Sequence, residues 1–313
     1  MRKEAVAQIR IGAEQAGQRI DNFLVRQLKG VPKSHVYRLL RTGQVRVNSA
    51  RIGADYRLQE DDLVRLPPVR TAQPSSPPTD TAAGVELPVV YEDEALLVVD
   101  KPAGVAVHGG SGVSAGVIEQ LRAQRPKAPF LELVHRLDKD TSGLLALAKK
   151  RSALTAMHQQ LREGHVEKHY LALVTGRWRN ARQRVRAPLR RYLTADGERR
   201  VNVDADGMNA DTLFVLQQSW PGYALLDAEL GTGRTHQIRV HLQHLGFPIA
   251  GDTKYGHAET NRTLRGLGLR RMFLHAARLS FNHPLKSEKI TLTAPIPQEL
   301  DAFLQRITED STQ

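Results

Sequence analysis

Residues 67–87, PPVRTAQPSSPPTDTAAGVEL, constrain the fold more than any other stretch of the chain. Pro, Ser, Thr and Ala replace there the periodic apolar residues that helices and strands need, which is typical of a linker. The sequence therefore predicts a small domain at residues 1–66 and a larger domain at residues 88–313. Each segment has a length that suits a single domain, and no internal repeat competes with this division.

Cysteine is absent from the 313 residues. This excludes disulfides, a cysteine nucleophile and any zinc site with cysteine ligands, and it fits a reducing cytoplasm. The first residues, MRKEAVAQIRIGAEQAGQ, lack the apolar core of a signal peptide, and no later run approaches the roughly 18 apolar residues of a membrane helix. We therefore expect a cytoplasmic protein that does not span a membrane.

The chain is strongly basic, since 45 Lys and Arg oppose 33 Asp and Glu and give a net charge of +12. This balance indicates a polyanionic partner, either nucleic acid or an anionic membrane, and a merely solvated basic surface is the alternative. Residues 1–66 hold 13 Lys and Arg against 7 Asp and Glu, a net charge of +6. Half of the charge in one small domain favours RNA binding there.

Two short helices are predicted in the N-terminal domain, in RIDNFLVRQLKG and PKSHVYRLLRTG. Apolar residues recur in both at helical spacing, and Gly30 and Gly43 stand where each helix should end. Alternating residues in QVRVN and the segment EDDLVRLP then predict a small β-ribbon. We expect the polar face of the second helix to bind RNA through Lys33, His35, Arg38 and Arg41.

The larger domain contains the stretch HRLDKDTSGLL, which places Asp138 where a strand meets a loop. On its own this aspartate would cap the turn that follows or pair with Arg136. A distant stretch, GTGRTHQIRVHLQHLGFPIAGDTKYG, is dense in Arg and His and could place a guanidinium opposite that carboxylate. Helices and strands alternate irregularly around both stretches, with an edge strand expected in ALLVVDK, which favours an α+β domain.

Several other classes of site lack their signatures. The 12 histidines raise the question of a metal-dependent nuclease or phosphatase, but neither His-Glu-x-x-His nor an acidic two-metal cluster occurs. The Gly-x-Ser-x-Gly of serine hydrolases is also missing. The loop KPAGVAVHGGSG matches neither the P-loop nor the dinucleotide-binding pattern. We therefore expect no metal site and no nucleotide cofactor.

Residues 17–66 resemble an S4 domain, a small RNA-binding module, through QRIDNFL, SHVYRLLRTGQVRVN and DDLVRL. The remainder resembles the RluA-type pseudouridine synthases through HRLD with TSG, EKHYLALV, GRTHQIRVH and FLHAARLSFNHP. The resemblance implies an α+β chain: an S4 domain of two helices and a β-ribbon, followed by a domain with a mixed, largely antiparallel sheet flanked by helices. It also implies an active-site cleft and chemistry without metal or organic cofactor.

The same resemblance implies roles for five residues. Asp138 would act as the nucleophile at C1′ of the sugar or C6 of the base, or would promote loss of the C2′ proton toward a glycal. Arg239 would keep it ionised and oriented, and Tyr170 would stack on the flipped uracil and help to remove the C5 proton. Arg136 would fill the space that the flipped base vacates, with a simple salt bridge as the competing interpretation. Leu274 would form an apolar wall, although core packing explains a leucine equally well.

The resemblance implies ribosomal RNA of the large subunit as the partner, free or within an assembling particle. Transfer RNA and small-subunit RNA are alternatives, because the charge pattern does not distinguish them. A second class of function is a non-catalytic RNA-binding or assembly factor. The presence of Asp138, Tyr170 and Arg239 together favours the enzyme, and we expect a monomer.

Overall fold

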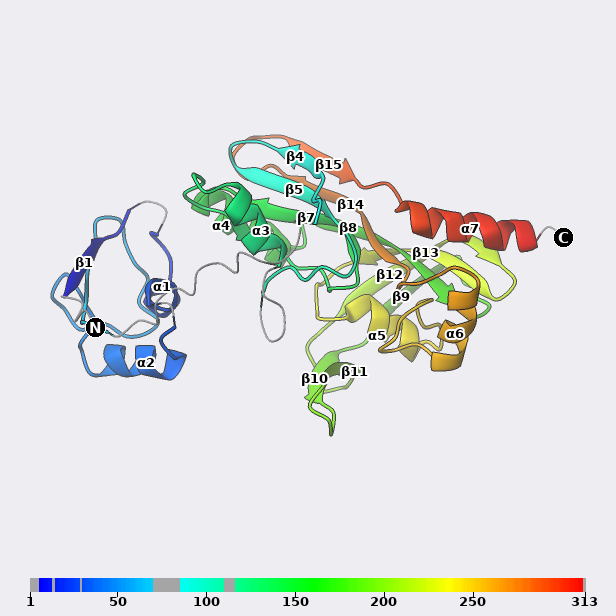
Figure 1. The fold of residues 1–313 in the computed structure, drawn as a ribbon, viewed down its shortest axis with the longest axis horizontal. Helices are drawn as coiled ribbons and strands as arrows, with labels where there is room; N and C mark the ends of the chain where they lie inside the picture. The colour runs from blue at the N-terminus through cyan, green and yellow to red at the C-terminus, as the bar shows by residue number, and fades with distance from the viewer. Residues whose placement is uncertain (1–5, 13–14, 29, 70–84, 110–115, 312–313) are drawn as a thin grey trace. The chain divides into compact units, whose positions relative to one another are not determined.

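The structure is a computed structural model that describes residues 6–12, 15–28, 30–69, 85–109 and 116–311. The chain divides into two compact units, Met1–Val85 and Glu86–Gln313 (Figure 1). Most of the predicted linker lies outside the described residues, so the boundaries at 66 and 88 stay predictions. Within the described part of the chain, no helix is long and apolar enough to cross a membrane.

The first unit packs two helices against a small sheet. Its elements are β1 (Ala7–Arg10), α1 (Ile20–Gln27), α2 (Lys33–Arg41), β2 (Arg46–Val47) and β3 (Leu63–Leu66), with strand order β1-β3-β2. Both predicted helices are present, and their apolar residues form the core. The expected two-stranded ribbon gains a third strand, β1, which precedes the helices. Its four residues are mostly exposed and pair with distant β3, so local periodicity does not reveal it.

The second unit is built on one large sheet. Strand β14 pairs in parallel with β7, and the other pairings are antiparallel, which confirms the mixed, largely antiparallel sheet of an α+β domain. The strand order is β4 (Val89–Glu92), β5 (Leu96–Lys101), β7 (Ser142–Ala148), β14 (Leu274–Asn282), β8 (Glu167–Thr175), β13 (Tyr223–Leu230), β12 (Asp211–Trp220) and β9 (Arg182–Arg186). Strand β6 (Glu132–Leu133) adds to β7 and β15 (Lys289–Thr293) to β14, whereas β10 (Leu189–Leu193) and β11 (Arg199–Val203) form a separate pair.

Helices cover both faces of this sheet, as the side chains of β5 show. Leu97 and Val99 join a cluster with α3 (Val117–Gln124) and α5 (Gln237–His244). Leu96 and Val98 point the other way, toward α4 (Arg151–Glu163). The expectation of an edge strand here is wrong, because β4 pairs with the outer side of β5. Helices α6 (Ala258–Gly266) and α7 (Gln298–Asp310) pack on a third cluster.

The parallel contact between β7 and β14 depends on one glycine. Gly143 pairs with Ala276 and has a φ of +110°, a conformation that side-chain-bearing residues rarely adopt. A Cβ at this position would collide with the backbone of Ala276. The glycine of the Thr-Ser-Gly sequence therefore permits the close approach of two strands directly after the loop that carries Asp138.

Candidate active site

Asp138 lies in the loop between β6 and β7, and backbone contacts hold this loop. The Thr141 N–H donates to the Asp138 carbonyl at 3.2 Å, and the Gly104 N–H donates to the Lys139 carbonyl at 2.9 Å. The Asp138 side chain is 25% exposed and lines a cleft of about 950 Å³. A carboxylate thus faces a space large enough for a nucleotide.

Lys101 anchors the same loop from the end of β5. Its side chain is fully buried, and its ammonium donates to the backbone carbonyls of Pro102, Val105 and Lys139 at 2.9, 3.0 and 3.1 Å. Burial lowers the pKa of Lys101 to about 7. Lys101 therefore connects Lys139, the residue after Asp138, to the loop that follows β5. From the sequence, this Lys-Pro-Ala-Gly segment was interpreted only as a loop without a nucleotide-binding pattern.

Arg239 reaches Asp138 from the first half of α5. Its Nη1 lies 3.4 Å from Asp138 Oδ2, so the two stretches singled out in the sequence do meet. Its Nε and Nη2 donate to the two carboxylate oxygens of Asp252, each at 2.8 Å. Burial alone would lower the pKa of Arg239, but the hydrogen bonds and charge of Asp252 outweigh burial and raise it. The guanidinium is therefore a permanently charged bridge between two carboxylates.

Asp252 was not predicted, although it belongs to the quoted GDTKYG segment. It is completely buried, and the backbone N–H groups of Lys254 and Tyr255 also donate to it, at 2.8 and 3.0 Å. Burial opposes ionisation of this carboxyl, but the Arg239 guanidinium and these N–H groups hold its pKa below the usual range. The signal available in the sequence was an aspartate at the start of a turn. The carboxylate of such an aspartate can accept from the backbone N–H groups two and three residues later.

Two more side chains complete the surroundings of Asp138. His236 has a φ of +54° just before α5, and its Nε2 lies 3.9 Å from Asp138 Oδ2. Its Nδ1 lies 2.7 Å from the hydroxyl of Tyr255, and the Tyr255 ring stacks on Arg239 with 5.0 Å between the guanidinium carbon and the ring centroid. Burial lowers the pKa of His236, so it is mainly neutral at pH 7. Among the described residues, Arg239 is therefore the permanently charged group within 4 Å of Asp138.

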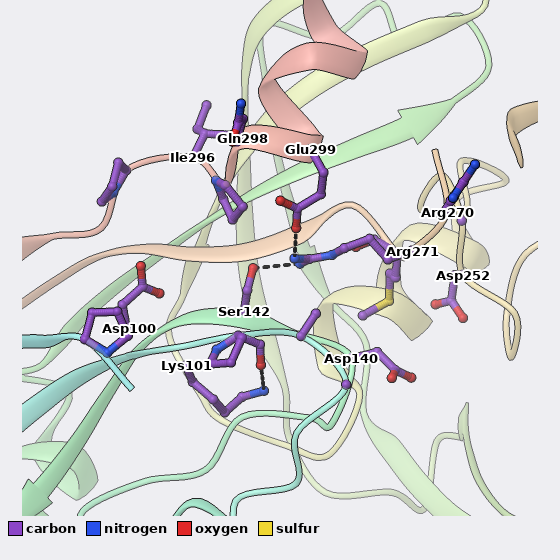
Figure 2. A pocket seen from close by; sticks show the side chains of 18 of the residues that line it. Asp100, Lys101, Asp140, Ser142, Asp252, Arg270, Arg271, Ile296, Gln298 and Glu299 are labelled. Carbon is purple, nitrogen blue, oxygen red and sulfur yellow. Dashed lines mark hydrogen bonds and ion pairs between the residues drawn. The ribbon is translucent and has the colours of Figure 1, made fainter. Parts of the chain in front are cut away.

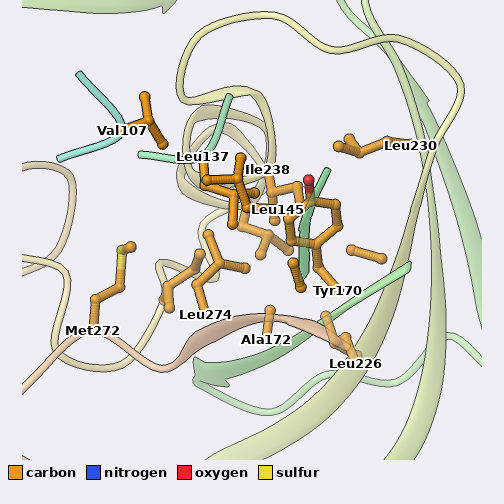
Figure 3. Close-up of a cluster of buried hydrophobic side chains, with 14 of the residues drawn as sticks. Val107, Leu137, Leu145, Tyr170, Ala172, Leu226, Leu230, Ile238, Met272 and Leu274 are labelled. Carbon is orange, nitrogen blue, oxygen red and sulfur yellow. The ribbon is translucent and has the colours of Figure 1, made fainter. Parts of the chain in front are cut away.

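Tyr170 and Leu274 line the cleft from neighbouring strands, β8 and β14. Figure 3 shows both in one apolar cluster with Leu137, which precedes Asp138 in the loop, and Ile238, which precedes Arg239 in α5. Burial, with a further contribution from the Asp138 charge, raises the pKa of Tyr170, so its phenol stays protonated at neutral pH. The structure brings both predicted residues to the wall of the cleft beside Asp138.

Arg136 lies on the same cleft but is exposed. The structure contains no ion pair between Arg136 and Asp138 within the residues that it describes, and Asp138 is engaged by Arg239 instead. The simple salt bridge that was the competing interpretation is thus not formed. Further basic residues line this cleft: Lys168, Arg191, Arg199, Arg200, Arg234 and Lys254.

A second cavity, of about 720 Å³, is lined by Asp252 and shares Arg239 with the cleft (Figure 2). Within it, Arg271 donates to Ser142 Oγ at 2.6 Å and to Glu299 at 2.9 Å (Figure 2). Ser142 Oγ also lies 2.9 Å from Nδ1 of the buried His275. These contacts hold Ser142 at the start of β7, directly before Gly143, which pairs with Ala276 of β14.

The four residues predicted to bind RNA lie on α2 of the first unit. Lys33, Arg38 and Arg41 are exposed and His35 is half-buried, while the apolar stripe of the same helix is buried. Across the described ranges of the whole chain, no group of three or more His, Asp or Glu is arranged to hold a metal ion.

Comparison with known proteins follows the same division. Residues 95–244 match the family described as RNA pseudouridylate synthase, and residues 18–64 match the S4 domain. A protein of Pasteurella multocida named ribosomal large subunit pseudouridine synthase C is 49% identical over 99% of this chain and 96% of its own length. Its namesake in Escherichia coli K12 is 51% identical over 96% of each chain.

Solved structures give the same result at lower identity. Human RNA pseudouridylate synthase domain containing 4 superimposes with a TM-score of 0.57 and 27% identity, over 71% of this chain and 93% of that one. Human RNA pseudouridylate synthase domain containing 1 gives 0.55 and 26%, over 76% and 98%. The full-length similarity, the matched motifs and the cleft around Asp138 lead to one conclusion: the chain belongs to the RNA pseudouridylate synthase family and carries an S4 domain.

Proposed function

We propose that this protein isomerises uridine to pseudouridine in large-subunit ribosomal RNA, with Asp138 as the nucleophile on a flipped-out uridine. The observation that carries the proposal is the carboxylate of Asp138, which faces a nucleotide-sized cleft and lies 3.4 Å from a buried arginine. The names of the similar proteins from Pasteurella multocida and Escherichia coli support the choice of RNA.

The reaction breaks the bond between N1 of uracil and C1′ of the sugar and forms a bond between C5 and C1′. The C5 proton is lost and N1 gains a proton, so the isomerisation needs no external reactant. An ionised carboxylate beside the sugar suits attack at C1′, attack at C6, or promotion of C2′ proton loss. Arg239 places a fixed positive charge 3.4 Å from the Asp138 carboxylate and limits its movement, because Asp252 already fixes the guanidinium.

The side chains around Asp138 support a bound, flipped base. Tyr170 offers its ring for stacking. Burial raises the pKa of its phenol, and this disfavours the phenolate that would be needed for the predicted removal of the C5 proton. Leu274 forms the apolar wall of the same cleft. The exposed side chain of Arg136 is free to enter the stack that the uridine leaves, which offsets part of the few kcal/mol that flipping costs.

RNA affinity would come from both units. The exposed cations of α2 suit backbone contacts by the S4 domain, and the exposed arginines along the cleft, Arg191, Arg199 and Arg234, suit phosphates near the target. We propose a monomer that acts in the cytoplasm, on free large-subunit RNA or on assembling particles. Site choice would then depend on RNA shape around the flipped uridine.

The test incubates the purified full chain with large-subunit RNA, immature large-subunit particles and transfer RNA, and maps pseudouridine by carbodiimide-dependent stops of reverse transcription. We expect new pseudouridines in large-subunit RNA with the wild type and none with Asp138→Asn. Conversion of transfer RNA alone would replace the proposed substrate. Tight RNA binding without any conversion would favour the non-catalytic assembly factor.

A further inference from the structure

Lys168 points into the catalytic cleft and has no role in the proposed chemistry. It lies on β8 two residues before Tyr170, and side chains two apart on a strand share a face. Both residues line the cleft that contains Asp138. Lys168 is only 9% exposed, so its ammonium is largely withdrawn from bulk water.

The backbone of Lys168 pairs with β14, but no described residue forms a hydrogen bond or an ion pair with its side chain. The carboxylates of the cleft are engaged elsewhere: Glu119 accepts from two backbone N–H groups, Glu132 pairs with Arg122, and Asp138 lies beside Arg239. Burial lowers the pKa of Lys168, and no neighbouring charge offsets this effect. An unpaired, buried ammonium is costly unless a ligand supplies an anion.

The surroundings of Lys168 leave room for such a ligand. Gly233 carries no side chain, and a Cβ built there would have Lys168 Nζ as its nearest neighbour, at 3.8 Å. His135 also lies near, and burial, with a smaller effect of the Lys168 charge, lowers the pKa of this histidine to about 4. It is therefore neutral at pH 7 and does not compete for an anion.

We propose that Lys168 binds a backbone phosphate of the flipped uridine. This inference rests on the proposed function, since it requires an RNA nucleotide in the cleft. Uracil is neutral at pH 7 whereas each phosphate carries a full charge, so a phosphate is the stronger partner for an ammonium. Side chains two residues apart on a strand are about 7 Å apart. The side chain of Lys168 therefore starts about 7 Å along β8 from Tyr170, beside the base that would stack on the tyrosine ring and not on it.

The experiment measures equilibrium binding of an RNA fragment that contains the target uridine, at several salt concentrations, to full chains that also carry Asp138→Asn and cannot turn over. With Lys168→Met we expect Kd to rise about tenfold and the slope of log Kd against log salt to fall by about 0.7. Lys168→Arg should retain both values. Lys289→Met, on an exposed lysine of β15 outside the cleft, is the matched control.

A second measurement uses chains with Asp138 intact and follows single turnovers at saturating RNA. The rate constant of Lys168→Met should stay within about threefold of wild type, because a phosphate contact is made equally in ground and transition states. A large loss of rate with unchanged Kd and salt slope would overturn the proposal and assign the lysine to the base. Unchanged binding and rate would also overturn it.

The two proposals fail in different ways. If the wild-type chain converts no uridine, the proposed function fails, whereas the binding assay on Asp138→Asn chains still tests Lys168. Thermal unfolding of each variant shows whether the fold is intact, and methionine is chosen because it keeps most of the apolar volume of the lysine stem. Lys168→Gln provides a second neutral variant with the same expected result.

Discussion

Asp252 holds the guanidinium of Arg239 through two hydrogen bonds of 2.8 Å, and this contact fixes the orientation of the arginine. Asp252 is in turn held by the backbone of residues 254 and 255. The remaining Nη1 of Arg239 faces Asp138 at 3.4 Å. The electrostatic environment of the proposed nucleophile is thus built into the fold, which is how preorganised sites avoid reorganisation during the reaction.

Asp252→Asn tests this preorganisation. The change leaves a buried guanidinium with only Asp138 as its charged partner, so we expect the free energy of unfolding to fall by about 3 kcal/mol. The single-turnover rate should also fall by at least about tenfold, because Arg239 loses its fixed orientation. Urea unfolding and quenched single-turnover assays measure the two effects. Glu94→Gln, which removes an exposed ion pair with Lys150, should change stability by less than about 1 kcal/mol.

Arg239→Lys tests the geometry of the guanidinium. Lysine keeps the charge but presents a single ammonium, which cannot bond both oxygens of Asp252 and also face Asp138. We expect the single-turnover rate to fall by about 10²-fold or more while RNA affinity stays within about threefold. A rate close to that of the wild type would mean that only the charge matters.

Lys101→Met tests the anchor of the Asp138 loop. Three backbone carbonyls lose their donor, so we expect a loss of about 2–4 kcal/mol in the free energy of unfolding. The rate of the folded variant should also fall, because the residue next to Asp138 is no longer held. Lys127→Met, on an exposed lysine, serves as the control for stability. Reduced stability with a full rate would limit Lys101 to a structural role.

His275 predicts how stability depends on pH. Burial lowers the pKa of this histidine to about 4, below the value of about 6.5 in an unfolded chain. Between these values the unfolded chain binds the proton and the folded protein does not. The contribution is therefore complete above pH 6.5 and is lost as the pH falls toward 4, by up to about 3 kcal/mol.

Denaturant titrations between pH 4 and 7 measure this effect, with His275→Asn as the variant. Asparagine keeps a polar atom near Ser142 but does not titrate, so the variant should show a shallower dependence on pH. His165→Asn, on an exposed side chain, is the control. Equal slopes for the wild type and His275→Asn would contradict the prediction.

The basic face of α2 predicts salt-dependent RNA binding. The double change Arg38→Glu and Arg41→Glu should raise the Kd for RNA at least about tenfold and reduce the salt slope by about 0.7 for each phosphate that is no longer bound. Arg10→Glu, on strand β1 of the same unit, is the control. An unchanged salt slope would show that α2 does not face the RNA.

Sequence motifs identified Asp138, Arg239, Tyr170 and Leu274, and the structure brings all four to one cleft. The same motifs did not reveal Asp252 or Tyr255, which lie only 13 and 16 residues beyond Arg239. These two act through one oriented turn, and a turn's orientation depends on the packing around it. Arg136, two residues before Asp138, was a possible ion-pair partner from the sequence, but Asp138 pairs with Arg239 of α5 instead.

The sequence by itself determined the elements that depend on neighbouring residues. These are the helices with apolar residues at helical spacing, the concentration of positive charge in residues 1–66 and the identity of the motifs, while the linker at 67–87 stays a prediction. Each follows from local periodicity, composition or residue type. Only the tertiary structure decided the contacts between distant segments: β1 with β3, Arg239 with Asp138, and the isolation of Lys168 from any described anion. Such contacts depend on strand register and on the packing of several elements at once, which no single stretch of sequence contains.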